Sequence, residues 1–81
     1  MAEHQIVSPL PGIFYRRPTP DRPSYKADGD RVAAGEIIGL VEVMKQFTEI
    51  EADAAGRIVR FLVDNEGPVE SGQAVLLIET G

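Results

Sequence analysis

The chain has 81 residues, of which 13 are acidic and 8 are basic, and its formal net charge is −5. This length suits one small domain with a thin core, which leaves little room for a catalytic constellation and favours a carrier or binding module over a free-standing enzyme. The acidic balance argues against nucleic acids and anionic membrane surfaces as partners, and the absence of cysteine excludes disulfides and thiolate metal sites.

The chain opens with a polar pentapeptide, residues 1–5, that contains its single histidine, His4. We expect this stretch to be a frayed terminus, with no ligand role for His4. It has neither the basic nor the apolar region of a signal peptide. No apolar run in the chain approaches the roughly 18 residues of a membrane span. The sequence therefore predicts a cytoplasmic protein.

Short apolar clusters, separated by glycine and proline, follow along the rest of the chain. They are rich in Val and Ile, and none reaches the ten or more residues expected of a helix. The glycines beside them are turn signals. The clusters are residues 13–15, 37–43, 58–63 and 75–78. This pattern predicts an all-β chain of about eight short strands.

A proline-rich segment, RRPTPDRPS at residues 16–24, follows the first cluster. Its three prolines lack backbone donors and have fixed φ angles, so it should project as a stiff irregular loop at about residues 17–24. The interval from Gly12 to Asp28 is seven residues longer than the matching interval from Gly56 to Asn65. The segment is thus an insertion in the first half. A plain solvated connector explains its composition equally well.

An internal repeat links the two halves of the chain. Residues 28–42 read DGDRVAAGEIIGLVE, and residues 65–79 read NEGPVESGQAVLLIE. Val, Gly, Leu and Glu recur between them at a constant offset of 37. Similarity of this kind indicates two β halves related by a pseudo-two-fold axis. Chance similarity is the weaker explanation, because the matches fall in one ungapped window.

Residues 40–50 predict a strand, a tight turn and a second strand, with Met44 and Lys45 at the turn. Two-residue hairpin turns favour Asn, Asp or Gly, which tolerate positive φ, whereas Met and Lys do not. Sequences tend to break such local rules where function requires it. The primary amine of Lys45 would be exposed at the apex and able to enter another protein's active site.

The alternation of side chains along this hairpin predicts its two faces. The core face should carry Val41, Val43 and Ile50, and the outer face Glu42, Phe47, Glu49 and Glu51. Phe47 would then be exposed close to Lys45. It would serve either as a contact for partner proteins or as an isolated exposed aromatic without a role.

The segment Glu42-Val43-Met44-Lys45 resembles the attachment motif of biotinyl domains, which usually reads Glu-Ala-Met-Lys-Met. The resemblance covers about residues 5–79, and within the family the chain looks like the carboxyl carriers of bacterial acetyl-CoA carboxylase. The other segments that carry it are Ser8-Pro9, Gly12, Phe14-Tyr15-Arg16, Pro18-Thr19-Pro20-Asp21, Ile50-Glu51-Ala52-Asp53, Gly56, Pro68-Val69 and Ile78-Glu79.

Three positions depart from the pattern of that family. Val43 replaces its small Ala, which should be tolerated because β-branching suits the strand that leads into the turn. Gln46 replaces the Met that usually follows the lysine, and this removes one soft apolar contact. Arg17 stands where better-known carriers have a small hydroxyl residue, so contacts between this loop and biotin cannot be copied across.

The resemblance implies a flattened barrel, or barrel-sandwich hybrid, of two four-stranded antiparallel sheets with pseudo-two-fold symmetry and a protruding thumb. Residues 1–81 would form a single biotinyl carrier domain. Biotin would be joined covalently to Lys45 within the motif residues Glu42, Val43, Met44 and Gln46. No catalytic residue or metal site is expected. The positions expected to dock partners are Phe47, Glu49, Arg17 and Thr19.

The resemblance also implies a mechanism and its partners. A biotin protein ligase would attach biotin to Lys45, a biotin carboxylase would load the carboxyl group, and a carboxyltransferase would pass it to an acceptor. The leading acceptor is acetyl-CoA, in the first step of fatty acid synthesis, while another acyl-CoA or a urea-like amide stays open. Two alternatives to a biotin carrier remain, namely a lipoyl carrier and an unmodified β-sandwich interaction module.

Overall fold

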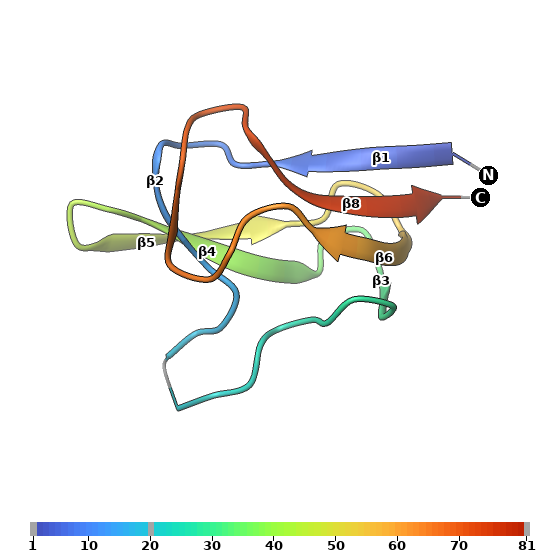
Figure 1. Ribbon diagram of the computed structural model, residues 1–81, viewed down its shortest axis with the longest axis horizontal. Helices are drawn as coiled ribbons and strands as arrows, with labels where there is room; N and C mark the ends of the chain where they lie inside the picture. Colours follow the sequence, from blue (N-terminus) through green and yellow to red (C-terminus); the bar gives the residue numbers. More distant parts are fainter. Residues whose placement is uncertain (1, 20, 81) are drawn as a thin grey trace.

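The computed structural model describes residues 2–19 and 21–80, and all regular structure in these ranges is strand. Eight strands form two four-stranded antiparallel sheets (Figure 1), ordered β1-β8-β6-β3 in the first sheet and β5-β4-β2-β7 in the second. The strands are β1 (Ala2–Val7), β2 (Gly12–Tyr15), β3 (Arg31–Val32), β4 (Ile37–Val43), β5 (Gln46–Glu51), β6 (Gly56–Phe61), β7 (Gly67–Val69) and β8 (Ala74–Thr80). The expected all-β sandwich is confirmed. Within these ranges no helix has the length and apolar character needed to cross a membrane.

The second half of the molecule repeats the first strand by strand. β8 begins and ends 37 residues after β4, which is the offset that the sequence repeat predicts. Each sheet order becomes the other when β1 is exchanged with β5, β2 with β6, β3 with β7 and β4 with β8. The equivalence extends to a shared irregularity, because the pairing skips Ile38 on β4 and Val75 on β8. The pseudo-two-fold symmetry is therefore a property of the backbone.

The core lies between the two sheets and is built from the inward side chains of both. Equivalent positions of the two halves supply it in pairs, such as Val41 with Ile78 and Phe14 with Ile58, all at most 1% exposed. Removing several methylene groups from such sites costs about 2–5 kcal/mol, so this core fixes the register of both sheets. Its fully or nearly buried members are Ile6, Phe14, Val32, Ile38, Val41, Ile50, Ala52, Ile58, Val69, Val75, Leu76 and Ile78.

The N-terminal segment is ordered, so the expectation of a frayed terminus is wrong. β1 pairs with β8 from Ala2, opposite Thr80, onwards. Backbone hydrogen bonds to β8 hold this edge strand although half of its side chains are polar. Ile6 is its one core residue, at 2% exposure. The His4 ring lies 2.7 Å from a carboxylate oxygen of Asp53, which ties the strand to the β5–β6 turn.

The insertion in the first half forms the expected irregular loop. The described residues between Tyr15 and Arg31 contain no helix or strand, and Figure 1 shows this segment as a loop that lies below the sandwich. Residues 17–24 are called the thumb below. Its two ends are close together, because the Tyr25 amide donates to the Arg16 carbonyl at 2.9 Å. The Arg22 amide donates to the Thr19 carbonyl at 3.1 Å, which closes a turn at the tip.

Candidate functional site

The β4–β5 hairpin ends in a two-residue turn at one end of the sandwich (left in Figure 1), opposite the chain ends. Val43 pairs with Gln46, so the predicted register is confirmed. Met44 has a φ of 51° and Lys45 a φ of 67°. Two successive positive φ angles characterise a type I′ turn, for which Asn and Gly are the usual residues. Left-handed backbone costs an L-residue about 1–2 kcal/mol, so the rest of the hairpin must hold this turn in place.

The two lysines of the chain have opposite environments. The Lys26 ammonium lies 2.5 Å from a carboxylate oxygen of Glu36 and donates to the Arg31 carbonyl at 3.1 Å. This contact lowers the pKa of the Glu36 carboxyl below its usual value. Lys45 is exposed, and its amine makes no hydrogen bond or ion pair with any residue that the structure describes. Of the two side-chain amines, that of Lys45 is the one free to react.

The faces of the hairpin follow the predicted alternation. Val41 and Ile50 are buried in the core, and Val43 packs against it. Met44 is 91% exposed and Phe47 is 56% exposed. An apolar surface therefore borders the free amine of Lys45 at the tip.

Tyr15 of β2 stands beneath this tip on the outer face of the second sheet. Its hydroxyl donates to a carboxylate oxygen of Glu42 at 2.7 Å. Its ring lies 5.8 Å from the ring of Phe47, centroid to centroid, at an angle of 55°. The hydrogen bond to Glu42 is the main cause that raises the pKa of Tyr15, and burial adds to it. Tyr15 thus touches both strands of the hairpin and stays a protonated donor at neutral pH.

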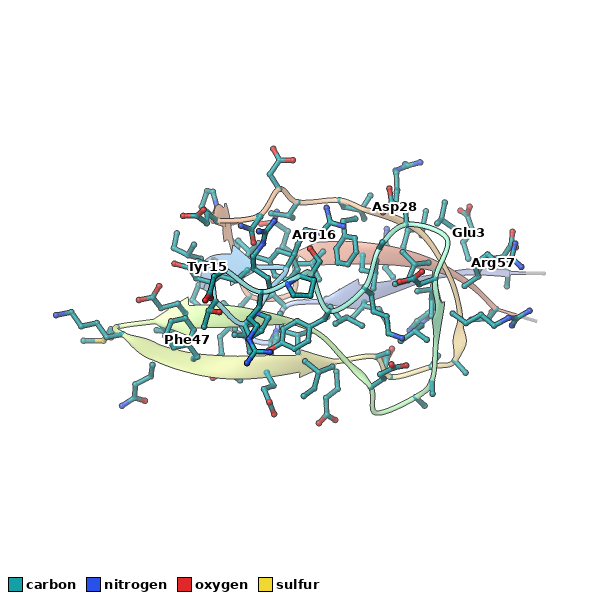
Figure 2. All side chains as sticks on the ribbon, turned by 90° about the horizontal axis from the view of Figure 1, so that it is seen from below. Glu3, Tyr15, Arg16, Asp28, Phe47 and Arg57 are labelled. Atoms are coloured by element: carbon teal, nitrogen blue, oxygen red, sulfur yellow. The ribbon has the colours of Figure 1, made fainter. Side chains whose placement is uncertain are left out.

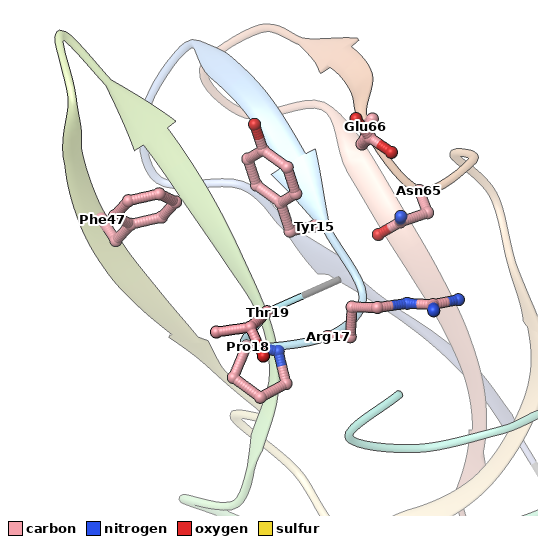
Figure 3. Close-up of a pocket in the computed structure, with 7 residues that line it drawn as sticks. All are labelled: Tyr15, Arg17, Pro18, Thr19, Phe47, Asn65 and Glu66. Atoms are coloured by element: carbon pink, nitrogen blue, oxygen red, sulfur yellow. The ribbon is translucent and has the colours of Figure 1, made fainter. Parts of the chain in front are cut away.

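A pocket of about 650 Å³ opens between the hairpin and the thumb (Figure 3). It brings together three of the four positions expected to dock partners. The fourth, Glu49, lines a separate groove of about 190 Å³ beside β1. The pocket is lined by Tyr15, Arg17, Pro18, Thr19, Phe47, Asn65 and Glu66.

Local hydrogen bonds fix the thumb side of this pocket. The Thr19 hydroxyl donates to Asp21 at 2.6 Å and lowers the pKa of that carboxyl. The Arg16 amide donates to the Asn65 side chain at 2.7 Å. The Arg16 guanidinium also lies 3.9 Å from the centroid of the Phe61 ring, within cation–π range. The base of the thumb is therefore attached to β6 and to the β6–β7 turn.

Four pocket residues were not predicted as site residues: Tyr15, Pro18, Asn65 and Glu66. Alternation from the core residue Phe14 places Tyr15 on the outer face, but its neighbours follow only from the pairing of β2 with β4. Glu66 has a φ of 67°, and its pseudo-symmetric equivalent is Gly29, with a φ of 89°. The repeat at offset 37 was thus the signal that could have identified Glu66 as an unusual residue.

The family model for biotin-requiring enzymes, which joins biotin and lipoyl domains, matches residues 4–78. The chain belongs to the biotin/lipoyl domain family. Its similar relatives include biotin carboxyl carrier proteins of acetyl-CoA carboxylase from three bacteria. The protein from Nostoc sp. is 39% identical over 93% of this biotin/lipoyl domain and 41% of its own length. The Chlamydia pneumoniae protein is 41% identical over 90% of this domain and 44% of its own length. The Streptococcus pyogenes protein is 40% identical over 98% of this domain and 48% of its own length.

Two solved structures share the fold of this biotin/lipoyl domain. The urea carboxylase of Kluyveromyces lactis superposes with a TM-score of 0.78 at 28% identity, over 98% of this chain and 6% of the enzyme. A single-chain, multi-domain long-chain acyl-CoA carboxylase gives a TM-score of 0.77 at 25% identity, over 98% of this chain and 7% of that enzyme. The chain spans less than half the length of the three carrier proteins and a small part of both carboxylases.

The family and the relatives imply covalently attached biotin as the cofactor of this biotin/lipoyl domain. The residues present fit such a group, because an amide bond to biotin requires a free amine at an accessible tip. Thr19, Asn65 and Phe47 line the pocket between the β4–β5 hairpin and the thumb. Among residues 2–19 and 21–80 no three potential metal ligands are clustered.

Proposed function

We propose that Lys45 carries biotin in amide linkage and that the chain is the carboxyl carrier of a biotin-dependent carboxylase, most specifically acetyl-CoA carboxylase. The observation that carries the proposal is the free amine of Lys45 at the apex of a strained type I′ turn. Residues 1–81 would act as one carrier domain in the cytoplasm, without catalytic residues of its own.

Attachment joins the Lys45 amine to the carboxyl group of biotin with loss of water, and the positive charge of the lysine disappears. The cofactor, once bound, supplies a ring nitrogen that accepts and releases a carboxyl group, while the protein supplies position and reach. Lys45 projects from the turn, so it can enter the sites of other proteins. Tethering raises the effective concentration of the carried group at each of those sites.

The partners of this carrier would be a biotin protein ligase, a biotin carboxylase and a carboxyltransferase. The apolar side chains of Met44 and Phe47 flank the lysine and offer a contact that each partner can use. The exposed carboxylate of Glu49 would orient the approach by its charge. Arg17 and Thr19 would contact partners from the thumb side of the pocket.

Acetyl-CoA as the acceptor is supported by the names of the three bacterial relatives. The titles of the two solved structures support a second candidate class, in which the acceptor is another acyl-CoA or urea. Affinity purification of the biotinylated chain from its own cells separates the two. Recovery of a carboxyltransferase that uses acetyl-CoA would support acetyl-CoA as the acceptor. Recovery of a carboxyltransferase that uses another acyl-CoA or urea would support the second class instead.

The attachment site is tested with a biotin protein ligase, biotin and ATP. We expect intact-mass measurement to show one added biotinyl group, and Lys45→Arg to abolish it, because the guanidinium does not form this amide. The matched control is Lys26→Arg, which removes the other lysine amine and should leave modification complete. Biotin found on Lys26, or an added lipoyl group in the native protein, would contradict the proposal.

A further inference from the structure

We infer that Tyr15 is a positioning residue for the Lys45 hairpin, which it holds in the presenting conformation through its hydrogen bond to Glu42 and its ring contact with Phe47. The inference rests on the proposed attachment site at Lys45. It concerns how that site is held and assigns Tyr15 no contact with biotin.

The contacts of Tyr15 reach across three strands. Tyr15 lies on β2, directly opposite Leu40 of β4. Glu42 lies two residues further along β4, nearer the turn, and pairs with Phe47 of β5. The Tyr15 side chain therefore leans toward the turn and reaches one residue on each strand of the hairpin. Figure 3 shows its hydroxyl directed toward the end of the sandwich that carries the turn.

The turn needs such support, because Met44 and Lys45 both have positive φ angles and project beyond the core. The core holds the inner face of the hairpin through Val41 and Val43. On the outer face, the hydrogen bond at 2.7 Å and the ring contact at 5.8 Å join Tyr15 to Glu42 and Phe47, the pair that precedes Val43 and Gln46 at the turn. A hydrogen bond to a carboxylate is among the stronger kinds, so it suits this task.

The opposite half of the molecule serves as an internal comparison. Arg60 occupies the position equivalent to Tyr15, because each pairs with the same leucine of the repeat, and Glu3 and Glu79 are the counterparts of Phe47 and Glu42. These three described residues share no hydrogen bond, ion pair or ring contact. Figure 2 shows Tyr15 and Phe47 together near the hairpin, and Glu3 and Arg57 near the chain ends. Among the described residues, the half that contains the chain ends therefore forms its sheet without an equivalent of this network.

The contact with Tyr15 also gives Glu42 a role within the chain. Its carboxylate accepts the Tyr15 hydroxyl, so part of it is turned toward β2 and used within the chain. If Glu42 acts mainly through Tyr15, then Glu42→Gln should be tolerated, because the amide oxygen still accepts the hydroxyl. Glu42→Ala should not be tolerated. A carboxylate that steers partners by charge would instead make both changes harmful.

The test compares Tyr15→Phe with Tyr25→Phe, which removes the only other tyrosine hydroxyl of the chain. The first readout is amide hydrogen exchange of Val43 and Gln46 in the unmodified protein, which needs no ligase. We expect Tyr15→Phe to accelerate it about tenfold, the effect of one hydrogen bond, while thermal unfolding loses no more than the stability of that single bond. The second readout is ligase kinetics, in which KM should rise about three- to tenfold while kcat changes by less than about twofold. Tyr25→Phe should alter neither readout.

A double-mutant cycle separates positioning from packing. In the Glu42→Ala background, Tyr15→Phe should have no further effect on exchange or on KM, since the acceptor is already gone. Additive effects, or a Tyr15→Phe protein indistinguishable from Tyr25→Phe, would overturn the inference. If the unchanged chain is not biotinylated at Lys45, the proposed function fails, while the exchange data still decide whether Tyr15 holds the hairpin.

Discussion

Three non-glycine residues among those described have positive φ angles: Met44, Lys45 and Glu66. Two form the hairpin turn and the third borders the pocket beside it. Backbone strain of this kind persists where the surrounding structure enforces it, and it clusters at functional sites. Two of the three described strained residues thus form the proposed attachment turn, and the third lines the pocket that Phe47 of the same hairpin borders. Strain and site coincide at the level of single residues.

Glu66→Gly tests the strain at the pocket. Glycine adopts positive φ freely and already does so at the equivalent residue Gly29, so the free energy of unfolding should rise by about 0.5–1 kcal/mol in urea titrations. Gly29→Ala is the matched reverse change. A Cβ at Gly29 meets no atom within 4 Å, so its expected loss of about 1 kcal/mol is a backbone effect alone. A loss of stability in Glu66→Gly would show that the carboxylate makes contacts worth more than the strain.

The hydroxyl of Tyr15 makes folding depend on pH in the alkaline range. Its pKa in the folded state is raised above the ordinary value of 10.0, mainly by the hydrogen bond to Glu42. The stabilisation is therefore complete below about pH 10 and is lost as pH rises through the higher folded value. Unfolding free energies measured between about pH 8 and 11 should fall more steeply for the unchanged chain than for Tyr15→Phe. Equal slopes would mean that Glu42 does not hold this proton.

At the scale of elements, the hairpin was largely predictable. A two-residue turn and the alternation of Val41 and Val43 with Glu42 predict its register, in which Val43 pairs with Gln46. The structure shows this pairing. The pocket was not predictable, because it joins the thumb, β2, β5 and the β6–β7 turn, which lie far apart in sequence. Tyr15 illustrates the limit, since its partner Glu42 is 27 residues away. Local pattern predicts a face, whereas contacts across strands depend on the pairing of the sheet.

Phe47→Ala tests the outer face of the hairpin. The Phe47 ring is half exposed and makes one aromatic contact, so its removal should cost about 1 kcal/mol of unfolding free energy. Phe14→Ala is the comparison, because Phe14 is fully buried and should lose about 3–5 kcal/mol. Ligase kinetics measured beside thermal unfolding should show slower biotinylation for Phe47→Ala. A stability loss as large as that of Phe14→Ala, with normal kinetics, would place Phe47 in the core.

The thumb can be removed without opening the sandwich, because its ends already meet at Arg16 and Tyr25. Replacing residues 17–24 by Asn-Gly should leave the strand content by circular dichroism unchanged. The rate of carboxyl transfer should change, because the pocket loses the wall formed by Arg17, Pro18 and Thr19. Unchanged transfer kinetics in this variant would reduce the thumb to a connector.

At the scale of the whole molecule, the repeat made the fold predictable and also explains where prediction failed. Equivalent strands bury equivalent residues, so a repeat of 15 residues in sequence indicated both sheets. The first strand lay outside that window, and its polar residues led to the wrong expectation of a frayed terminus. Its equivalent, β5, is just as polar and is also an edge strand with a single isoleucine in the core. Symmetry, applied to the chain end, would have corrected the error.

The pairing of Ala2 with Thr80 has a consequence for how the chain closes on itself. Under the pseudo-two-fold axis, Thr80 corresponds to Val43 and Ala2 to Gln46, so the gap between the chain ends is the counterpart of the Met44-Lys45 turn. A two-residue link across that gap would make the backbone a ring of two like halves, open to circular permutation. The long axis of 38 Å then has two alike poles. One is closed by the turn that carries Lys45, the proposed attachment point, and at the other β1 and β8 pair through Ala2 and Thr80.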